Sequence, residues 1–152
     1  MTRRATTPPL TSIQPQLRRF ELARQQLIAQ VCRRQQVTRT EFDALDELSH
    51  SDGLTPGELG ERLSLTSGSV TALIDRLERL GWAARAAHPG DRRKLLVRST
   101  PKAVKVGARE IGPLVLAVNA VAEQFSARDQ RTIERFLEQA ADAVSAIVAA
   151  EQ

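Results

Sequence analysis

The chain has 152 residues, 41% of them hydrophobic and 3% aromatic, with 22 Lys and Arg against 18 Asp and Glu. This length suits one domain, and so few aromatic residues argue against a stacking platform for single-stranded nucleic acid. With no signal peptide, no apolar run of about 20 residues and a single cysteine, the sequence predicts a cytoplasmic protein without a membrane segment.

Residues 1–12, rich in Thr and Pro, predict a disordered arm, and residues 13–152 predict one domain. Helix starts are marked by three capping boxes, in which a hydroxyl residue precedes an acid by three positions: Thr38 with Glu41, Thr55 with Glu58, and Ser126 with Asp129. Pro56 and Pro101 suit first helical positions, and Gly81 suits a helix end. The predicted helices are 13–34, 39–49, 56–63, 67–80, 101–124 and 127–150.

Two short strands, 82–87 and 94–98, lie between the fourth and fifth helices. Their connector, residues 88–93, contains Pro89, Gly90 and Asp91, so the pair predicts a hairpin. The fold class is therefore mainly α with a small β-hairpin.

The first and last helices carry long apolar stripes, formed by Ile13, Leu17, Phe20, Leu27 and Val31 and by Ile133, Phe136, Leu137, Val144, Ile147 and Val148. Stripes of this length need a surface to bury them. An intramolecular helix pair is one interpretation. Because the middle of the chain already forms a compact unit, pairing with a second subunit is favoured.

Helices 56–63 and 67–80, joined by a very short turn, predict a helix-turn-helix. The second helix has one apolar face, formed by Val70, Leu73, Ile74, Leu77 and Leu80. Another face has small residues near its N-terminus and cations further along, namely Gly68, Ser69, Ala72, Arg76 and Arg79. Slim side chains followed by arginine suit entry into a major groove, although any amphipathic surface helix is polar on one side.

A basic run follows this helix. From Trp82 to Arg109 there are eight Lys and Arg and one acid, Asp91. Three of the cations, Arg92, Arg93 and Lys94, lie at the hairpin turn, which favours contact with a minor groove or the DNA backbone. Asp91 would hold an arginine extended through a charge-assisted hydrogen bond. The alternative is a solvated turn.

These segments resemble the MarR (multiple antibiotic resistance regulator) family of winged helix-turn-helix regulators. The resemblance lies in residues 54–59, 66–81 and 89–93, continuing to Thr100 and Pro101, with the family's DxR wing motif on Asp91 and Arg93. It implies dimerisation through residues 13–37 and 101–152, and a DNA-binding region at 38–100. The partner implied is a pseudo-palindromic site in double-stranded DNA, contacted by Thr66, Ser67, Ser69, Arg76, Arg79, Asp91, Arg92, Arg93 and Lys94.

Most members of the family repress transcription, and many release DNA when a small, often phenolic compound binds. The resemblance therefore allows for a small aromatic effector. The sequence departs from the family at 99–103, where Ser-Thr-Pro-Lys-Ala replaces the usual Leu-Thr followed by Gly, and this should alter the helix entry slightly. Oxidant-sensing members carry a cysteine near the start of the first helix. Cys32 lies near its end, which favours a packing role.

Three rival functions fit the sequence less well. An enzyme is disfavoured because His50, His88 and Cys32 lie in different segments and no glycine-rich phosphate loop occurs. A metal sensor is disfavoured because one Cys and two scattered His cannot form a zinc or copper site within one subunit, and no metal or cofactor is expected, although metal binding by carboxylates alone stays open. A winged-helix protein-interaction module without specific DNA binding stays open, but it would leave the Arg-rich turn unexplained.

Overall fold

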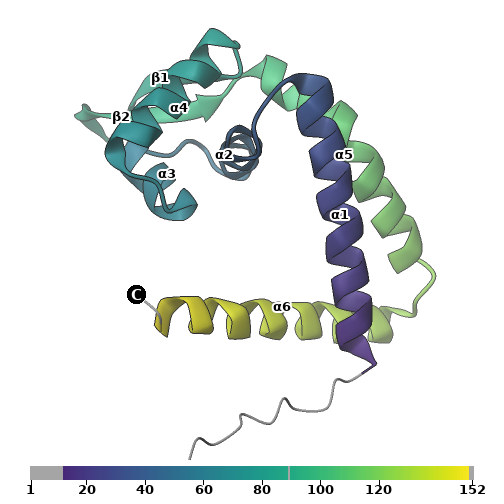
Figure 1. The fold of residues 1–152 in the computed structure, drawn as a ribbon. Coiled ribbons are helices and arrows are strands. Elements are labelled where there is room, and N and C mark those ends of the chain that lie inside the picture. The colour runs from purple at the N-terminus through teal and green to yellow at the C-terminus, as the bar shows by residue number, and fades with distance from the viewer. Residues whose placement is uncertain (1–11, 89, 151–152) are drawn as a thin grey trace, which may run out of the picture. The chain divides into compact units, whose positions relative to one another are not determined.

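The computed structural model describes residues 12–88 and 90–150, with backbone alone at His88, Asp91, Arg92 and Arg93. The predicted arm at 1–12 lies, apart from Ser12, outside the described residues. The elements in chain order are α1 Ile13–Gln35, α2 Arg39–Ser49, α3 Pro56–Leu63, α4 Ser67–Arg79, β1 Ala83–His88, β2 Asp91–Ser99, α5 Pro101–Ala122 and α6 Ala127–Ala150 (Figure 1). The predicted fold class, mainly helical with one antiparallel hairpin, is confirmed.

Capping hydrogen bonds explain why the helices begin where they do. Before α2, the Glu41 N–H donates to Thr38 Oγ1 at 3.1 Å and the Thr38 N–H donates back to Glu41 Oε2 at 2.8 Å. Thr55 and Glu58 form the same reciprocal pair before α3. At Ser126 the hydroxyl accepts from the Asp129 N–H at 3.2 Å and donates to its carboxylate at 2.6 Å. Each predicted start is therefore confirmed.

Helix ends agree with the predictions to within two residues. Helix α1 ends at Gln35, one residue late, and α5 ends at Ala122, two residues early. Helix α4 ends at Arg79, where Gly81 turns the chain out with φ +70°. The N–H of Gly81 donates to the Glu78 carbonyl at 2.8 Å, and that of Trp82 donates to the Leu77 carbonyl at 2.9 Å. This pair of hydrogen bonds forms a Schellman motif, which needs a left-handed residue such as glycine.

The hairpin differs from the prediction at its turn. Strands β1 and β2 pair in register from Ala83 with Ser99 to Ala87 with Leu95, and then His88 pairs with Asp91. The predicted six-residue connector at 88–93 was therefore wrong, because only residues 89 and 90 separate the strands. Residues 92–94 of β2 have no register partner between the last two pairs, so the ladder is irregular there. Because of this irregularity, the first residues of β2 lack the alternating pattern by which a strand is recognised in a sequence.

A buried core joins α2, α3, α4 and the hairpin. Its members are all hydrophobic: Ala44, Leu48, Leu54, Leu59, Val70, Leu73, Ile74, Leu77, Ala83 and Val97. The predicted apolar face of α4 supplies four of them, and its fifth member, Leu80, is half-buried. Leu54, ahead of α3, also pairs with Val97 of β2 through two backbone hydrogen bonds of 3.0 and 2.7 Å. This bridge attaches the hairpin to the start of the helix-turn-helix.

The chain divides into two compact units, Met1–Val106 and Gly107–Gln152. The core lies in the first unit. The second contains the rest of α5 and all of α6, and no described residue of either helix is buried. The predicted stripe on α6 is exposed along its length, from Ile133 to Val148. Within the described residues, no helix is long and apolar enough to cross a membrane.

Candidate nucleic-acid interface

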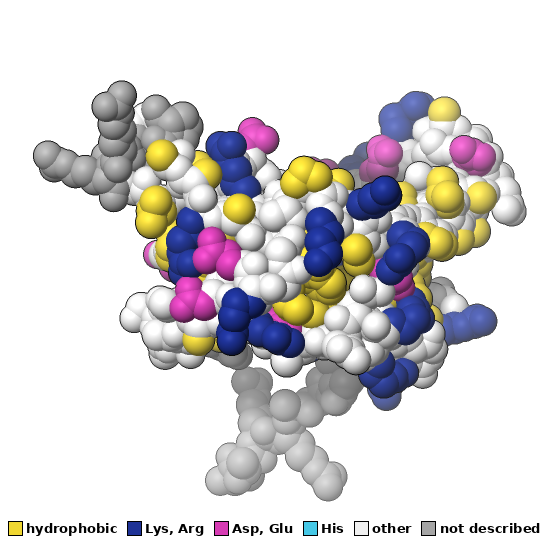
Figure 2. All heavy atoms as spheres, turned by 90° about the horizontal axis from the view of Figure 1, so that it is seen from above, with side chains coloured by type: hydrophobic (Ala, Val, Ile, Leu, Met, Phe, Trp, Pro, Cys, Tyr) yellow, Lys and Arg dark blue, Asp and Glu magenta, His cyan; other side chains and the backbone are white. Residues whose placement is uncertain are grey.

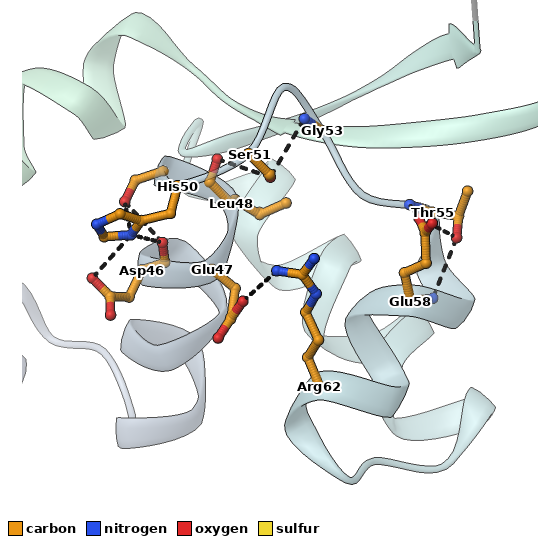
Figure 3. Close-up of polar contacts among 10 residues, drawn as sticks. Asp46, Glu47, Leu48, His50, Ser51, Gly53, Thr55, Glu58 and Arg62 are labelled. Carbon is orange, nitrogen blue, oxygen red and sulfur yellow. Dashed lines mark hydrogen bonds and ion pairs between the residues drawn. The ribbon is translucent and has the colours of Figure 1, made fainter. Parts of the chain in front are cut away.

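Polar contacts hold α3, the first helix of the predicted helix-turn-helix, against α2. Arg62 of α3 donates to Glu47 of α2 at 2.8 Å (Figure 3). In the loop between these helices, Ser51 donates to the Leu48 carbonyl and accepts from the Gly53 N–H, both at 3.4 Å. These bonds connect α3 to α2 and order the loop between the two helices.

The turn from α3 to α4 spans three residues, beginning with Ser64 at φ 53°. The Leu65 N–H donates to the Gly60 carbonyl at 2.9 Å. A Cβ placed on Gly60 would lie 3.0 Å from Val70 Cγ2 and 3.3 Å from the Leu65 carbonyl oxygen, so the two helices meet at a position that only glycine fits easily. The close approach sets the angle between α3 and α4.

The N-terminal turns of α4 present small side chains to solvent. Ser67, Gly68, Ser69 and Ala72 are exposed, and a Cβ on Gly68 would meet nothing within 4 Å. Thr66 caps the helix: its hydroxyl lies 3.0 Å from that of Ser69 and also accepts the Ser69 N–H at 3.4 Å. A helix start with small side chains and open space suits the approach of a phosphate or a base edge.

The two arginines predicted on this helix have different surroundings. Arg79 is exposed, and its Nε donates to the Asp75 carbonyl at 3.4 Å. Arg76 is half-exposed, with its Nε 3.4 Å from Oε1 of Glu41 on α2. Sequence reasoning missed this ion pair. The pair joins residues 35 positions apart in the chain, and the capping box with Thr38 already explained Glu41, so nothing in the sequence pointed to a second partner.

Arg85 of β1 is a second residue whose role the sequence did not reveal. Its guanidinium pairs with Asp75 at 2.7 Å and with Glu78 of the same helix, while its N–H donates to Glu78 at 3.0 Å. The hydrogen bond to Asp75 raises the pKa of Arg85 further above its ordinary value. Arg85 therefore ties the hairpin to α4 and adds little free positive charge. The available signal was a pair of acids, Asp75 and Glu78, one turn apart on a helix that the sequence predicts to contact DNA.

The hairpin carries the predicted wing residues Asp91, Arg92, Arg93 and Lys94. Lys94 is exposed, and the side chains of the other three lie outside the described part of the chain. Residues 92–94 coincide with the irregular stretch of β2. Figure 2 shows one face of the molecule, on which many Lys and Arg side chains are exposed with fewer carboxylates between them.

The entry to α5 is bonded to the end of α4. Thr100 donates to the Trp82 carbonyl through its N–H at 3.0 Å and to the Gly81 carbonyl through its hydroxyl at 2.8 Å. Lys102 Nζ donates to the Leu80 carbonyl at 2.8 Å. The residues that depart from the family pattern at 99–103 thus cap the C-terminus of α4, where a cation is favourable.

The residues considered for other chemistry are separated from one another. His50 is exposed, and its Nδ1 lies 2.8 Å from the Asp46 carbonyl at the end of α2 (Figure 3). Partial burial raises the pKa of Cys32, which leaves less reactive thiolate. Among the described residues, no group of three or more His, Cys, Asp or Glu could hold a metal ion.

Comparison with known proteins gives a family and a fold. Residues 35–94 match the MarR family. The uncharacterized HTH-type transcriptional regulator YcgE of Bacillus subtilis is 33% identical over 103 residues, covering 68% of this chain and 67% of that protein. The structure of a MepR point mutant from a multidrug-resistant S. aureus clinical isolate has a TM-score of 0.73 at 18% identity, covering 90% of this chain and 99% of that one. The S. aureus MepR–DNA complex has a TM-score of 0.58 at 19% identity, covering 84% and 96%.

Proposed function

This chain belongs to the MarR family, whose members are transcription regulators and not enzymes, and we propose that it binds a specific site in double-stranded DNA as a homodimer and represses transcription there. The observation that carries the proposal is the exposed N-terminal face of α4, built from Ser67, Gly68 and Ser69 beside a hairpin rich in cations. A solved complex of MepR, which shares this fold, contains DNA. A protein that binds bacterial chromosomal DNA acts in the cytoplasm.

The dimer is supported by the apolar surface left at the two ends of the chain. Phe20 of α1 is 52% exposed, and the α6 stripe from Ile133 to Val148 is exposed throughout. A second copy covers these faces and places two α4 helices in successive major grooves, about 34 Å apart. The site in DNA is then two-fold symmetric, with half-sites roughly 10 base pairs apart.

In the DNA-bound dimer, Thr66, Ser67 and Ser69 lie at the major groove with Arg76 and Arg79 beyond them. At the wing, Asp91 orients Arg93 into the minor groove while Arg92 and Lys94 face phosphates. Arg92→Ala should weaken binding to all DNA alike and lower the salt slope by about one. Arg93→Ala should cost most when the flanking sequence is A·T-rich. The reverse pattern would assign the minor groove to Arg92.

An effector, by resemblance, is a small aromatic compound that binds the dimer. It must prefer the conformation that does not bind DNA, and DNA must weaken its binding by the same factor. A panel of phenolic and other aromatic acids tests this through DNA affinity and melting temperature. If neither changes, the regulator is controlled by its own abundance.

The decisive experiment identifies the genomic fragments that the purified protein retains, followed by footprinting on those fragments. We expect a small set that shares one two-fold symmetric sequence. Retention of all fragments alike, or of none, contradicts sequence-specific recognition. In that case a winged-helix module that binds another protein explains the chain better, because binding a protein requires no recognition of a DNA sequence.

A further inference from the structure

Glu41 is a buried carboxylate with a partner on each side. Its side chain is 9% exposed, and it lies in the first turn of α2. Oxygen Oε2 accepts the Thr38 N–H at 2.8 Å and thereby closes the capping box. Oxygen Oε1 faces Arg76 Nε of α4 at 3.4 Å. The carboxylate therefore connects the start of one helix to a cation on another.

The second capping box of the chain shows that capping alone does not require this arrangement. Glu58 accepts both the Thr55 N–H at 2.7 Å and the Thr55 hydroxyl at 2.8 Å through a single oxygen, Oε2, and its side chain is exposed. A buried carboxylate is costly unless a cation or hydrogen bonds compensate it. The cap therefore does not require Glu41 to be buried, and the buried charge is compensated by both the Thr38 N–H and Arg76.

Arg76 occupies the stripe of α4 that faces outward at the helix N-terminus. It follows Ser69 by seven residues, which returns to the same face at 100° per residue and lies about 10 Å further along the axis. Its side chain is 43% exposed, so the ion pair through Nε leaves part of the group accessible. Arg79 lies three residues on, without an ion pair to another helix among the contacts of the described residues.

We propose that Glu41 is a positioning residue for DNA recognition: it holds Arg76 through Nε, so that the outer edge of the guanidinium is presented to a base in one fixed orientation. The inference rests on the proposed function, because it needs Arg76 to meet DNA. An arginine that is already ordered loses less conformational freedom on docking, and its fixed plane favours one donor pattern. Glu41 thus sharpens sequence discrimination without touching DNA.

An ion pair that only stabilises the fold would behave differently. Its loss would lower the melting temperature and weaken binding to specific and to non-specific DNA equally. Loss of a positioning residue changes the ratio of specific to non-specific affinity, and the change is confined to one base pair of each half-site.

The test compares Glu41→Gln with Glu58→Gln in the full-length dimer. Both variants keep an oxygen for the cap and remove one negative charge, but only the first removes the ion pair to α4. Binding is measured by fluorescence anisotropy on the genomic site, on copies changed at one base pair each, and on non-specific DNA. Arg76→Ala and the double variant Glu41→Gln/Arg76→Ala complete the cycle.

We expect Glu41→Gln to lose roughly threefold to tenfold in discrimination at the base pair where Arg76→Ala loses discrimination. Glu58→Gln should keep the discrimination of the unmodified protein, and the double variant should be no worse than Arg76→Ala. Equal behaviour of the two Gln variants, or an additive double variant, overturns the inference. If the unmodified protein binds no DNA specifically, the proposed function itself fails, which is a different result.

Arg76→Lys provides a route that does not depend on the folding of Glu41→Gln. Lysine keeps the charge but lacks Nε and the planar group, so discrimination should fall as far as in Arg76→Ala while non-specific affinity is retained. Discrimination in Arg76→Lys equal to that of the unmodified protein would overturn the inference.

Discussion

The two compact units of this chain differ in how they use apolar residues. The first encloses a core in which Ile74, Leu77 and Val97 have no exposed surface. The second has comparable side chains, such as Leu137 at 50% and Ile147 at 62% exposure, and buries none of its described helical residues. The first unit therefore has a buried core of its own, whereas the apolar stripe of the second, like Phe20 of α1, is surface that the proposed dimer would cover.

The largest effect should come from placing charges on the α6 stripe. Leu137→Asp combined with Val144→Asp puts two carboxylates where the proposed second copy packs, and burying them there is costly. We expect sedimentation equilibrium to show monomers and DNA affinity to fall by two orders of magnitude or more, because each monomer reaches only one half-site. Gln139→Asp, on the opposite face of α6, is the control. Dimers that survive the double substitution would refute this use of the stripe.

Shortening one leucine in each unit should separate the two kinds of burial. Leu77→Ala empties a fully buried position and should cost about 2–5 kcal/mol in the free energy of unfolding at any protein concentration. Leu137→Ala should cost much less in dilute protein and more as dimers form. Chemical denaturation at two protein concentrations measures both. If the stability lost in Leu137→Ala does not depend on protein concentration, the Leu137 side chain packs in the core of its own subunit.

Much of the first unit could be predicted from sequence because its signals are local. The hydroxyl and acid pairs at Thr38 and Thr55 predict the helix starts through bonds within one turn. The spacing of Val70, Leu73 and Leu77 identifies the buried face of α4, since every helix residue advances by a fixed angle. Neither signal depends on the rest of the fold.

The missed features all depend on contacts between distant segments. Strand β2 begins at Asp91 because β1 pairs with it, although its first residues have the composition of a turn. The bridge of Leu54 to Val97 involves a single residue and has no period to detect. The ion pairs of Arg76 and Arg85 join acids and bases on different elements, so the sequence shows the charges without their partners.

Two glycines of the helix-turn-helix, Gly60 and Gly68, give the next comparison, because the first lies in a close contact and the second faces open space. Gly60→Ala forces a methyl group against Val70 and the Leu65 carbonyl, neither of which can move freely. Overpacking of this kind outweighs the better helix propensity of alanine, so we expect a net loss of about 1–2 kcal/mol in thermal or urea unfolding. A gain in stability would show that the contact between α3 and α4 is looser than these distances indicate.

Thr55→Ala should have a smaller, pH-dependent effect. Removing the capping hydroxyl costs about 1 kcal/mol at neutral pH. Hydrogen bonds from the Thr55 N–H and hydroxyl lower the pKa of Glu58, so this stabilisation is present above the ordinary glutamate pKa and is lost as the pH falls through the lowered one. The difference from the unmodified protein should therefore shrink in acid. A difference in unfolding free energy that does not change with pH would show that the Thr55 cap acts independently of the Glu58 carboxylate.

Gly68→Ala is the smallest change in stability and the most direct probe of the exposed face. An added methyl meets nothing within 4 Å, and alanine favours the helix, so unfolding should become harder by about 0.5 kcal/mol. If DNA approaches the first turn of α4 closely, the same methyl must occupy space that the DNA needs, and affinity should fall. Higher stability together with weaker DNA binding would identify this turn as a DNA contact surface. A stabilised variant with unchanged affinity would move the contact further along α4, toward Arg76 and Arg79.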